Sequence, residues 1–402
     1  MTVRAGIFAL LCLVLIGAAS PAPSPAVTPS IELAQSRVET MLQTGHADPA
    51  WFSQSFLDQV PASKVDEVIA SLVKQLGPYR SIELTPDKFV AHFAKGTDDV
   101  LIHLDADAKI DGLLFRPPVV TSGSLDDALR AFREQPGTLS YVIAGESRSE
   151  RAALNPSASL AVASAFKLAV LNALRDQIAL RRRRWSEVVP LEQRWKSAPS
   201  GVLQKWPAGT PITIATYAAE MISISDNTAA DALASIVGTG ALRPYAFGND
   251  PFLTTREVFV LHSDPNADLR SAYLAATTPS AQSAIAQRAA KRALPRFTQL
   301  LGTPLLSIEW HYSVRQLCTL MERVADLPLM SINPGVADPA EFRHVAYKGG
   351  SDTGVLNMTT MVTTRRGTRI CFSATINDAK HDIANAGFET SYSAVLGTLA
   401  RF

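Results

Sequence analysis

The order of helical and strand-like segments limits the folds open to the larger, C-terminal part of the chain. One strand-like segment, LSYVIAG at residues 139–145, comes before a long helical stretch. Three more follow it, RHVAYKGG (343–350), LNMTTMVTT (356–364) and RICFSATIN (369–377), and an amphipathic segment (386–402) ends the chain. Such apolar and β-branched runs predict strands, and a sheet must bury a face against another layer. We therefore expect strands from both ends to form one sheet, with helices inserted between them.

The preceding segment has a different character, which together with the length of 402 residues predicts two domains. Alternating strand-like runs at residues 89–93 and 100–104 follow a segment of helical periodicity. That periodicity is carried by Val65, Val68, Ile69, Leu72 and Leu76. Helices followed by an antiparallel sheet predict a small α+β domain over residues 31–118. Pro117, Pro118 and TSGS (121–124) indicate a boundary, so the second domain is predicted over 124–402.

The first thirty residues are typical of an export signal followed by a linker. Arg4 precedes an uncharged apolar run from Ala5 to Ala19, which ends in small residues, and SPAPSPAVTPS (20–30) is rich in Pro and Ser. We expect cleavage within residues 1–30 and a mature protein that is periplasmic or extracellular, with no obligatory membrane insertion; an uncleaved anchor is the alternative. Of the three cysteines, Cys318 and Cys371 would remain, either free or as one disulfide.

Charge and histidine content exclude several function classes. The formal net charge is +1, so no global field favours nucleic acid or an anionic membrane. The seven histidines are scattered and form no metal-binding motif. We predict neither a metal nor a cofactor, and a small-molecule substrate.

Ser164 and Lys167 stand three residues apart where an apolar helical pattern begins, in SAFKLAVLNAL. Residues at this spacing on a helix have Cβ atoms about 5–6 Å apart, so the lysine can reach the serine hydroxyl. Burial of Lys167 would lower its pKa and make it a usable base. The same spacing recurs at Ser71 and Lys74, but mid-helix and without further motifs, and we interpret that pair as solvated.

Two further motifs follow in order: Ser225-Asp226-Asn227, and Lys348-Gly349-Gly350-Ser351 at the end of a strand-like run. The ordered set resembles that of the penicillin-recognising serine hydrolases, which include class A β-lactamases and D,D-peptidases and carry Ser-x-x-Lys, Ser-Asp-Asn and Lys-Thr-Gly. The resemblance covers residues 124–402. It implies the β-lactamase/transpeptidase-like fold, an antiparallel sheet with flanking and inserted helices. The α+β leader is similar to the cystatin- or NTF2-like domain of a secreted subgroup.

The resemblance also implies a role for each motif residue. Ser164 would be the acylated nucleophile and Lys167 its base, Ser225 would pass a proton to the leaving group, and Lys348 would supply positive charge. Asn227 would bind a side-chain amide of the substrate. The backbone N–H groups of Ser164 and Ser351 would form the oxyanion hole, with Gly350 leaving room beside them.

This chain departs from the family pattern at two places. Gly349 replaces a Thr or Ser whose hydroxyl binds the substrate carboxylate, and Ser351 or Thr353 is the candidate substitute. The Glu that activates the deacylating water in class A enzymes has no counterpart at the expected position. Glu257 is the nearest carboxylate and the candidate base; a salt bridge with Arg256 or Arg270 is its alternative role.

We therefore predict an exported active-site serine hydrolase that forms an acyl-enzyme with β-lactams, that is, a β-lactamase. One alternative is a D,D-peptidase or esterase of the same fold, acting on a peptide or ester. Another is a penicillin-binding sensor that is acylated once and does not turn over. Turnover of a chromogenic cephalosporin separates β-lactamase from sensor, and hydrolysis of a short-chain ester identifies the esterase.

Overall fold

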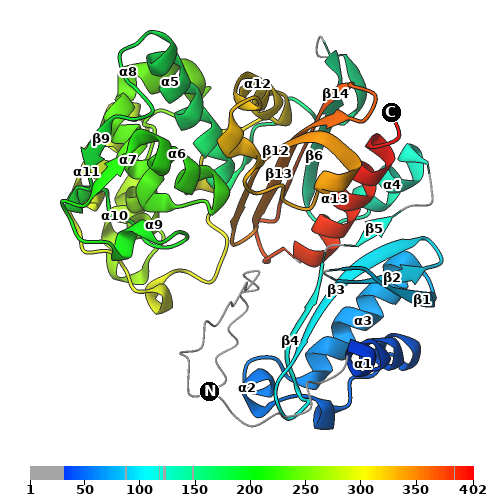
Figure 1. The fold of residues 1–402 in the computed structure, drawn as a ribbon. Coiled ribbons are helices and arrows are strands. Elements are labelled where there is room, and N and C mark those ends of the chain that lie inside the picture. Colours follow the sequence, from blue (N-terminus) through cyan, green and yellow to red (C-terminus); the bar gives the residue numbers. More distant parts are fainter. Residues whose placement is uncertain (1–30, 87, 117, 121–123, 147–148, 384) are drawn as a thin grey trace. The chain divides into compact units, whose positions relative to one another are not determined.

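The computed structural model describes residues 31–86, 88–116, 118–120, 124–146, 149–383 and 385–402 (Figure 1). The predicted signal peptide and linker lie outside the described residues. The chain divides into two compact units. One contains the described residues up to Ala128 with Asn385–Gly397, and the other contains Leu129–Ala384 with Thr398–Phe402. The domain limits at residues 118 and 124 stay a prediction.

The first unit has helices followed by an antiparallel sheet, which confirms the predicted α+β order. The helices before its sheet are α1 (Ile31–Thr44), α2 (Gln54–Leu57) and α3 (Ala62–Leu76). The strands β1 (Tyr79–Leu84), β2 (Phe89–Phe93), β3 (Gly96–Leu104) and β4 (Ile110–Phe115) pair in that order, and β5 (Val119–Val120) pairs with β3. The periodic residues of α3 lie in the core, except Val68, which is 40% exposed at the edge of the apolar stripe.

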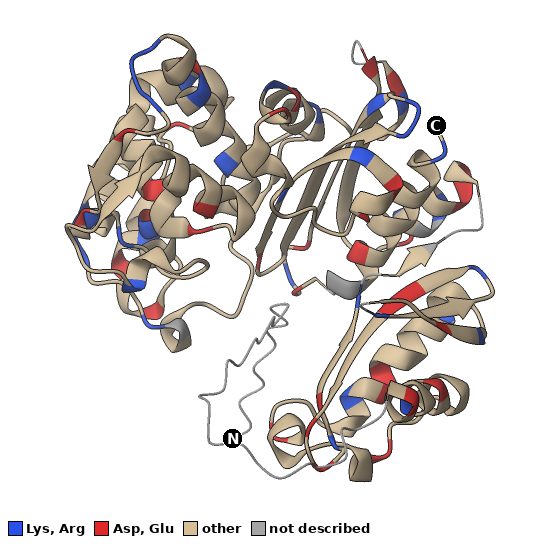
Figure 2. Cartoon of the chain, viewed as in Figure 1, with Lys and Arg blue, Asp and Glu red and all other residues tan. Residues whose placement is uncertain are grey.

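The second unit is built on a five-stranded antiparallel sheet whose strands come from both ends of the segment, as predicted. Its order is β12 (Phe342–Asp352), β13 (Val355–Thr364), β14 (Arg369–Asn377), β6 (Thr138–Ala144) and β7 (Glu150–Leu154). Figure 2 shows β13 without charged residues, in agreement with burial along nearly its whole length. β12 is an edge strand, so its backbone is open to another segment or a ligand.

Helices fill the chain between β7 and β12, and Figure 1 shows most of them gathered beside the sheet. They are α5 (Lys167–Ala179), α6 (Ile214–Ser223), α7 (Asn227–Val237), α8 (Thr239–Ala246), α9 (Thr255–Leu261), α10 (Ala267–Ala275), α11 (Pro279–Ala290) and α12 (Val314–Val324). The first two turns of α5 are buried on every side, because α7, α8 and α12 pack around them. α4 (Leu125–Arg133) precedes β6, and α13 (Asn385–Leu399) forms most of the amphipathic segment that ends the chain.

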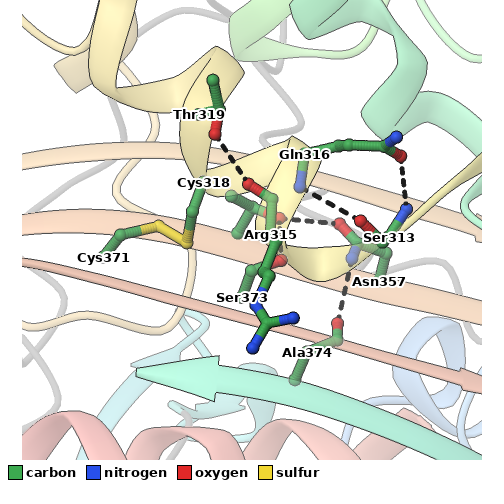
Figure 3. The surroundings of a disulfide bond; sticks show 10 residues. Ser313, Arg315, Gln316, Cys318, Thr319, Asn357, Cys371, Ser373 and Ala374 are labelled. Carbon is green, nitrogen blue, oxygen red and sulfur yellow. Dashed lines mark hydrogen bonds between the residues drawn. A yellow bond between two sulfur atoms is a disulfide. The ribbon is translucent and has the colours of Figure 1, made fainter. Parts of the chain in front are cut away.

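Cys318 of α12 and Cys371 of β14 form a disulfide (Figure 3). The sequence left this pairing open. α12 begins with a capping box, in which the side chains of Ser313 and Gln316 each bind the other's backbone N–H. The disulfide therefore ties a well-defined helix, which also packs on α5, to the middle of the sheet. Among the residues described, no helix combines the length and apolar character needed to cross a membrane.

Candidate active site

The turn that carries Ser164 is held by segments far away in the sequence. A short strand, β8 (Leu160–Ala161), pairs with β11 (His311–Tyr312), and the next N–H, of Val162, donates to the Trp310 carbonyl at 2.9 Å. The side chain of Asn377 binds both the N–H and the C=O of Ala161, each at 2.9 Å. Ala163 then adopts a left-handed φ of 43° and starts the 3-10 turn η3 (Ala163–Phe166). Ser164 is thus fixed at the entrance of α5.

The structure brings four predicted residues into one continuous polar chain. The Nζ atom of Lys167 lies 3.0 Å from Ser164 Oγ and 2.9 Å from Ser225 Oγ. Ser225 Oγ in turn lies 3.1 Å from Nζ of Lys348. A proton that leaves Ser164 can therefore reach Ser225 through Lys167 without crossing bulk water.

The oxygen atoms around Lys167 can be satisfied by a neutral amine. Besides the two serine hydroxyls, Nζ contacts the carbonyl of Ser225 and, at 2.7 Å, Oδ1 of Asn227. These two oxygens can only accept, so an NH2 group satisfies both and keeps its lone pair for a serine hydroxyl. Burial lowers the pKa of Lys167 well below its usual value, and the nearby charge of Lys348 lowers it further, against a smaller opposing effect of Asp226 and Asp231.

Lys348 points from β12 into the same buried region. Its Nζ contacts Ser225 Oγ and the carbonyl of Gly349. Burial lowers the pKa of this ammonium to about 7. At neutral pH Lys348 is therefore near its midpoint, and an anionic ligand beside it would stabilise the charged form.

The Ser-Asp-Asn motif forms a tight turn before α7. Ser225 has a left-handed φ of 57°, and the buried carboxylate of Asp226 caps α7 through the N–H of Ala229 at 2.8 Å. It also accepts N–H bonds from Val202 and Leu203. This explains why an aspartate stands between two residues that face Lys167.

Both ends of the Asn227 amide are engaged within the protein. Its Oδ1 accepts from Lys167, and its Nδ2 donates to the Ala198 carbonyl at 3.1 Å. Nδ2 carries a second N–H, which is compatible with the predicted hydrogen bond to a substrate amide.

The edge strand β12 runs directly against the turn of Ser164. A Cβ atom at Gly350 would lie 2.1 Å from the Val162 carbonyl oxygen and 2.7 Å from the backbone nitrogens of Ser164 and Ala165. Only glycine permits this approach. Ser351, the next residue, is exposed, and its place on β12 beside Ser164 is compatible with the predicted pair of oxyanion-hole donors.

Tyr347 occupies the space that a side chain at position 349 would need. A Cβ atom at Gly349 would lie 2.2 Å from the Tyr347 hydroxyl oxygen. The ring is seated over Gly335, where a Cβ atom would lie 2.7–2.8 Å from ring atoms. The hydroxyl group of Tyr347 therefore lies where the Thr or Ser side chain of the family would stand. It is a further candidate for binding the substrate carboxylate, in addition to Ser351 and Thr353, and the sequence did not reveal it.

Glu257 does not join the polar chain of Ser164 and Lys167 through any described contact. It occupies the third position of α9, where its carboxylate accepts the Thr254 N–H at 2.7 Å in a capping box. The alternative salt bridge is also absent from its described contacts, since Arg256 and Arg270 donate to backbone carbonyls. Burial raises the pKa of Glu257. Its role as a water-activating base stays a prediction.

Asp231 is a buried residue that the sequence interpretation overlooked. Its carboxylate accepts the backbone N–H groups of Thr255 and Arg256 at 2.7 and 2.9 Å. Burial raises its pKa to about 7, although these hydrogen bonds oppose the shift. Asp231 thereby fixes the start of α9 against α7. The sequence could have indicated this residue, because an aspartate on the buried face of the helix that follows Ser225 must find hydrogen-bond donors inside the protein.

With this geometry in place, comparison with known families decides the relationship. The model of the beta-lactamase enzyme family matches residues 124–400. The chain belongs to this family. No protein with a curated description matches the sequence.

Several solved structures resemble this family member. A beta-lactamase from Sphaerobacter thermophilus DSM 20745 is 18% identical, with a TM-score of 0.48, over 68% of this chain and 95% of that one. A beta-lactamase from Chitinophaga pinensis DSM 2588 is 17% identical, with a TM-score of 0.47, over 69% and 98%. PBP-A is 16% identical, with a TM-score of 0.45, over 69% and 95%. The match of the family model to residues 124–400 indicates a β-lactamase-like fold for that part of the chain, and the cystatin- or NTF2-like character of the first unit stays a prediction.

Within the described ranges, the family member has no group of three or more His, Cys, Asp or Glu residues arranged to hold a metal ion.

Proposed function

We propose that this member of the beta-lactamase family is an exported serine hydrolase that forms an acyl-enzyme with β-lactams and hydrolyses it. The observation that carries the proposal is the unbroken chain from Ser164 Oγ through Lys167 to Ser225 and Lys348. A nucleophile, a neutral base, a proton carrier and a cation stand in the order that acyl transfer requires.

The acylation step follows from these contacts. Neutral Lys167 takes the proton of Ser164, whose oxygen attacks the lactam carbonyl. The oxygen of that carbonyl becomes negative beside the N–H groups of Ser164 and Ser351. When the ring C–N bond breaks, the nitrogen receives a proton from Ser225, which Lys167 replaces. Lys348 attracts a carboxylate on the substrate and keeps it close to Ser225.

Deacylation is the slower half of the proposed cycle. Glu257 is held in the capping box of α9, so no carboxylate in the described contacts faces Ser164 as a general base. The attack of water then depends on Lys167, which must be neutral again after acylation so that its lone pair can accept a proton from the water. We expect the acyl-enzyme to accumulate.

Two features support export. The apolar segment at residues 5–19 has the form of a signal peptide. Cys318 and Cys371 form a disulfide, a bond that persists mainly in oxidising compartments.

An esterase is the second candidate, and the substitution at Gly349 favours it. Position 349 has no Thr or Ser hydroxyl of its own to bind a substrate carboxylate. A simple ester carries no such carboxylate and needs only the acylation machinery.

Intact-mass spectrometry of the mature protein with a penicillin, sampled from seconds to hours, tests the proposal. We expect a mass gain that decays slowly with release of product. Ser164→Ala should abolish the gain, whereas Ser71→Ala, which changes the serine of the other Ser-x-x-Lys sequence, should leave it unchanged. A permanent adduct would favour the sensor, and ester hydrolysis without an adduct would favour the esterase. An adduct on Ser164→Ala would refute the assignment of the nucleophile.

A further inference from the structure

A second polar cluster lies beside the Ser164 turn. The carboxyl group of Glu309 accepts the backbone N–H groups of Ala163 and Trp310 and is hydrogen-bonded to the carboxyl group of Asp352. His262 completes the cluster, with its Nδ1 3.7 Å from Oδ2 of Asp352. None of these residues belongs to the motifs recognised in the sequence.

The cluster connects the two walls of the predicted oxyanion hole. Ala163 directly precedes Ser164, whose N–H is one donor. Asp352 directly follows Ser351, whose N–H is the other. Glu309 stands just after the 3-10 turn η8 (Leu306–Ile308) and contacts both. A change at Glu309 therefore shifts Ala163 and Asp352, and each of these two residues is bonded directly to a residue that supplies an oxyanion-hole N–H.

Two carboxylates cannot hydrogen-bond each other without a proton between them. Oε2 of Glu309 is buried and meets no N–H or O–H donor among the described residues. His262 does not supply one, because Nε2 lies 3.0 Å from the Ile308 carbonyl and must carry its proton there. The distance from Nδ1 to Asp352 exceeds a hydrogen bond. The proton must therefore reside on the carboxyl pair.

The charged surroundings favour this protonated state. Burial raises the pKa of Glu309 well above its usual value, and the neighbouring Asp352 raises it further. The pKa of His262 is lowered by burial and by Arg270, against the opposing effect of Asp352, so its ring is neutral near neutral pH. Asp352 itself is 33% exposed and keeps a 2.7 Å bond from the Thr353 N–H, so it remains in contact with water.

We infer that Glu309 and Asp352 are positioning residues, whose single shared proton holds the Ser164 turn against strand β12. The inference rests on the proposed function, because it assigns the pair to the oxyanion hole of that reaction. Removal of the proton at alkaline pH places two negative charges side by side. Their repulsion separates the walls, and acylation slows although Ser164 and Lys167 are intact.

Substitutions at Glu309 distinguish this role from simple packing. Glu309→Gln keeps an oxygen for the Ala163 N–H and supplies an N–H to Asp352 at every pH, so it imitates the protonated pair. Glu309→Ala and Asp352→Ala remove the bridge. Asp268→Asn changes an exposed carboxylate paired with Arg292 in the same unit and is the matched control.

Acylation rate constants are measured by intact mass from neutral to alkaline pH, with a penicillin and with a fluorophosphonate. At neutral pH we expect Glu309→Gln to react like wild type and both Ala variants to be at least about tenfold slower, since one oxyanion donor is worth about 100- to 1000-fold. The alkaline decline of wild type should be reduced in Glu309→Gln and unchanged in Asp268→Asn. Superimposable profiles for wild type and Glu309→Gln, or an Ala variant that reacts like wild type, would overturn the inference.

Infrared spectroscopy of Ser164→Ala provides a readout that needs no activity. Near neutral pH the spectrum should lose one protonated-carboxyl band when Glu309→Gln is added, while the bands of other buried carboxyls such as Asp98 remain; an unchanged spectrum would overturn the shared proton. Reaction with the fluorophosphonate but not with penicillin, with the expected variant pattern, would refute β-lactam chemistry and support the pair. Normal acylation by penicillin in all variants would support β-lactam chemistry and refute the role of the carboxyl pair.

Discussion

Gly350→Ala should slow acylation without touching any catalytic side chain. The added Cβ atom would lie 2.1 Å from the Val162 carbonyl oxygen. Unstrained non-bonded contacts are about 3.5 Å long, so β12 and the Ser164 turn must separate by about 1 Å or more. A misplacement of this size costs about 100-fold in rate, and overpacking costs about 1–3 kcal/mol of folding free energy. Backbone strain adds nothing, because Gly350 has no positive φ.

Stopped-flow mixing with a penicillin, followed by intact mass, measures the acylation rate, and thermal unfolding measures stability. Gly240→Ala is the matched control, since a Cβ atom there meets nothing within 4 Å and lies in α8. We expect that control to acylate normally and to gain about 0.4–1 kcal/mol. Wild-type acylation by Gly350→Ala would show that the approach of β12 to Val162 does not control the oxyanion hole.

Three further perturbations follow from buried groups and from the disulfide. The profile of kcat/KM against pH should be bell-shaped. The rate should rise as Lys167 loses its proton and becomes a base, at a pH well below the usual lysine pKa. It should fall as Lys348 loses its charge when the pH passes about 7. A rate that still rises to the usual lysine pKa would contradict the neutral amine. Replacing both Cys318 and Cys371 by Ser should cost about 4 kcal/mol, because the disulfide closes a loop with a sequence separation of 53; equal urea midpoints for variant and wild type would refute this. Asp98→Asn should stabilise the first unit at alkaline pH. Burial and Asp99 raise the pKa of Asp98, so the stability of wild type is full below the unfolded-state pKa and declines as pH rises through the raised value. Urea unfolding at acid and alkaline pH should show the gain only at the latter.

Local patterns were sufficient to predict the main elements. The apolar and β-branched runs at residues 343–350 and 369–377 and the periodicity of α3 reflect burial in the core, which neighbouring residues alone indicate. Ser164, Lys167, Ser225 and Lys348 were predicted because the order of three short motifs resembles that of a known family, whereas the spacing of Ser164 and Lys167 alone recurs at Ser71 and Lys74. The structure then brings them together.

Contacts between distant segments could not be predicted in the same way. The approach of Tyr347 to Gly349 depends on the rotation of an aromatic ring over Gly335, which no periodicity encodes. Glu309 and Asp352 stand in separate segments, and each looks like an ordinary polar residue alone. The pairing of Cys318 with Cys371 required knowledge that α12 packs on β14.

The clamp of Asn377 on Ala161 has a consequence for the order in which the protein matures. A ribosome that has synthesised the chain as far as Lys348 has made all four residues of the polar chain. The turn of Ser164 nevertheless lacks the side chain that binds both backbone groups of Ala161, and β6 lacks its neighbour β14. Closure of the sheet must wait for nearly the last residues, because its contacts are so distant in sequence. A nascent chain that ends at Lys348 would thus contain every reactive group, and we expect it to react only after Asn377 has been added.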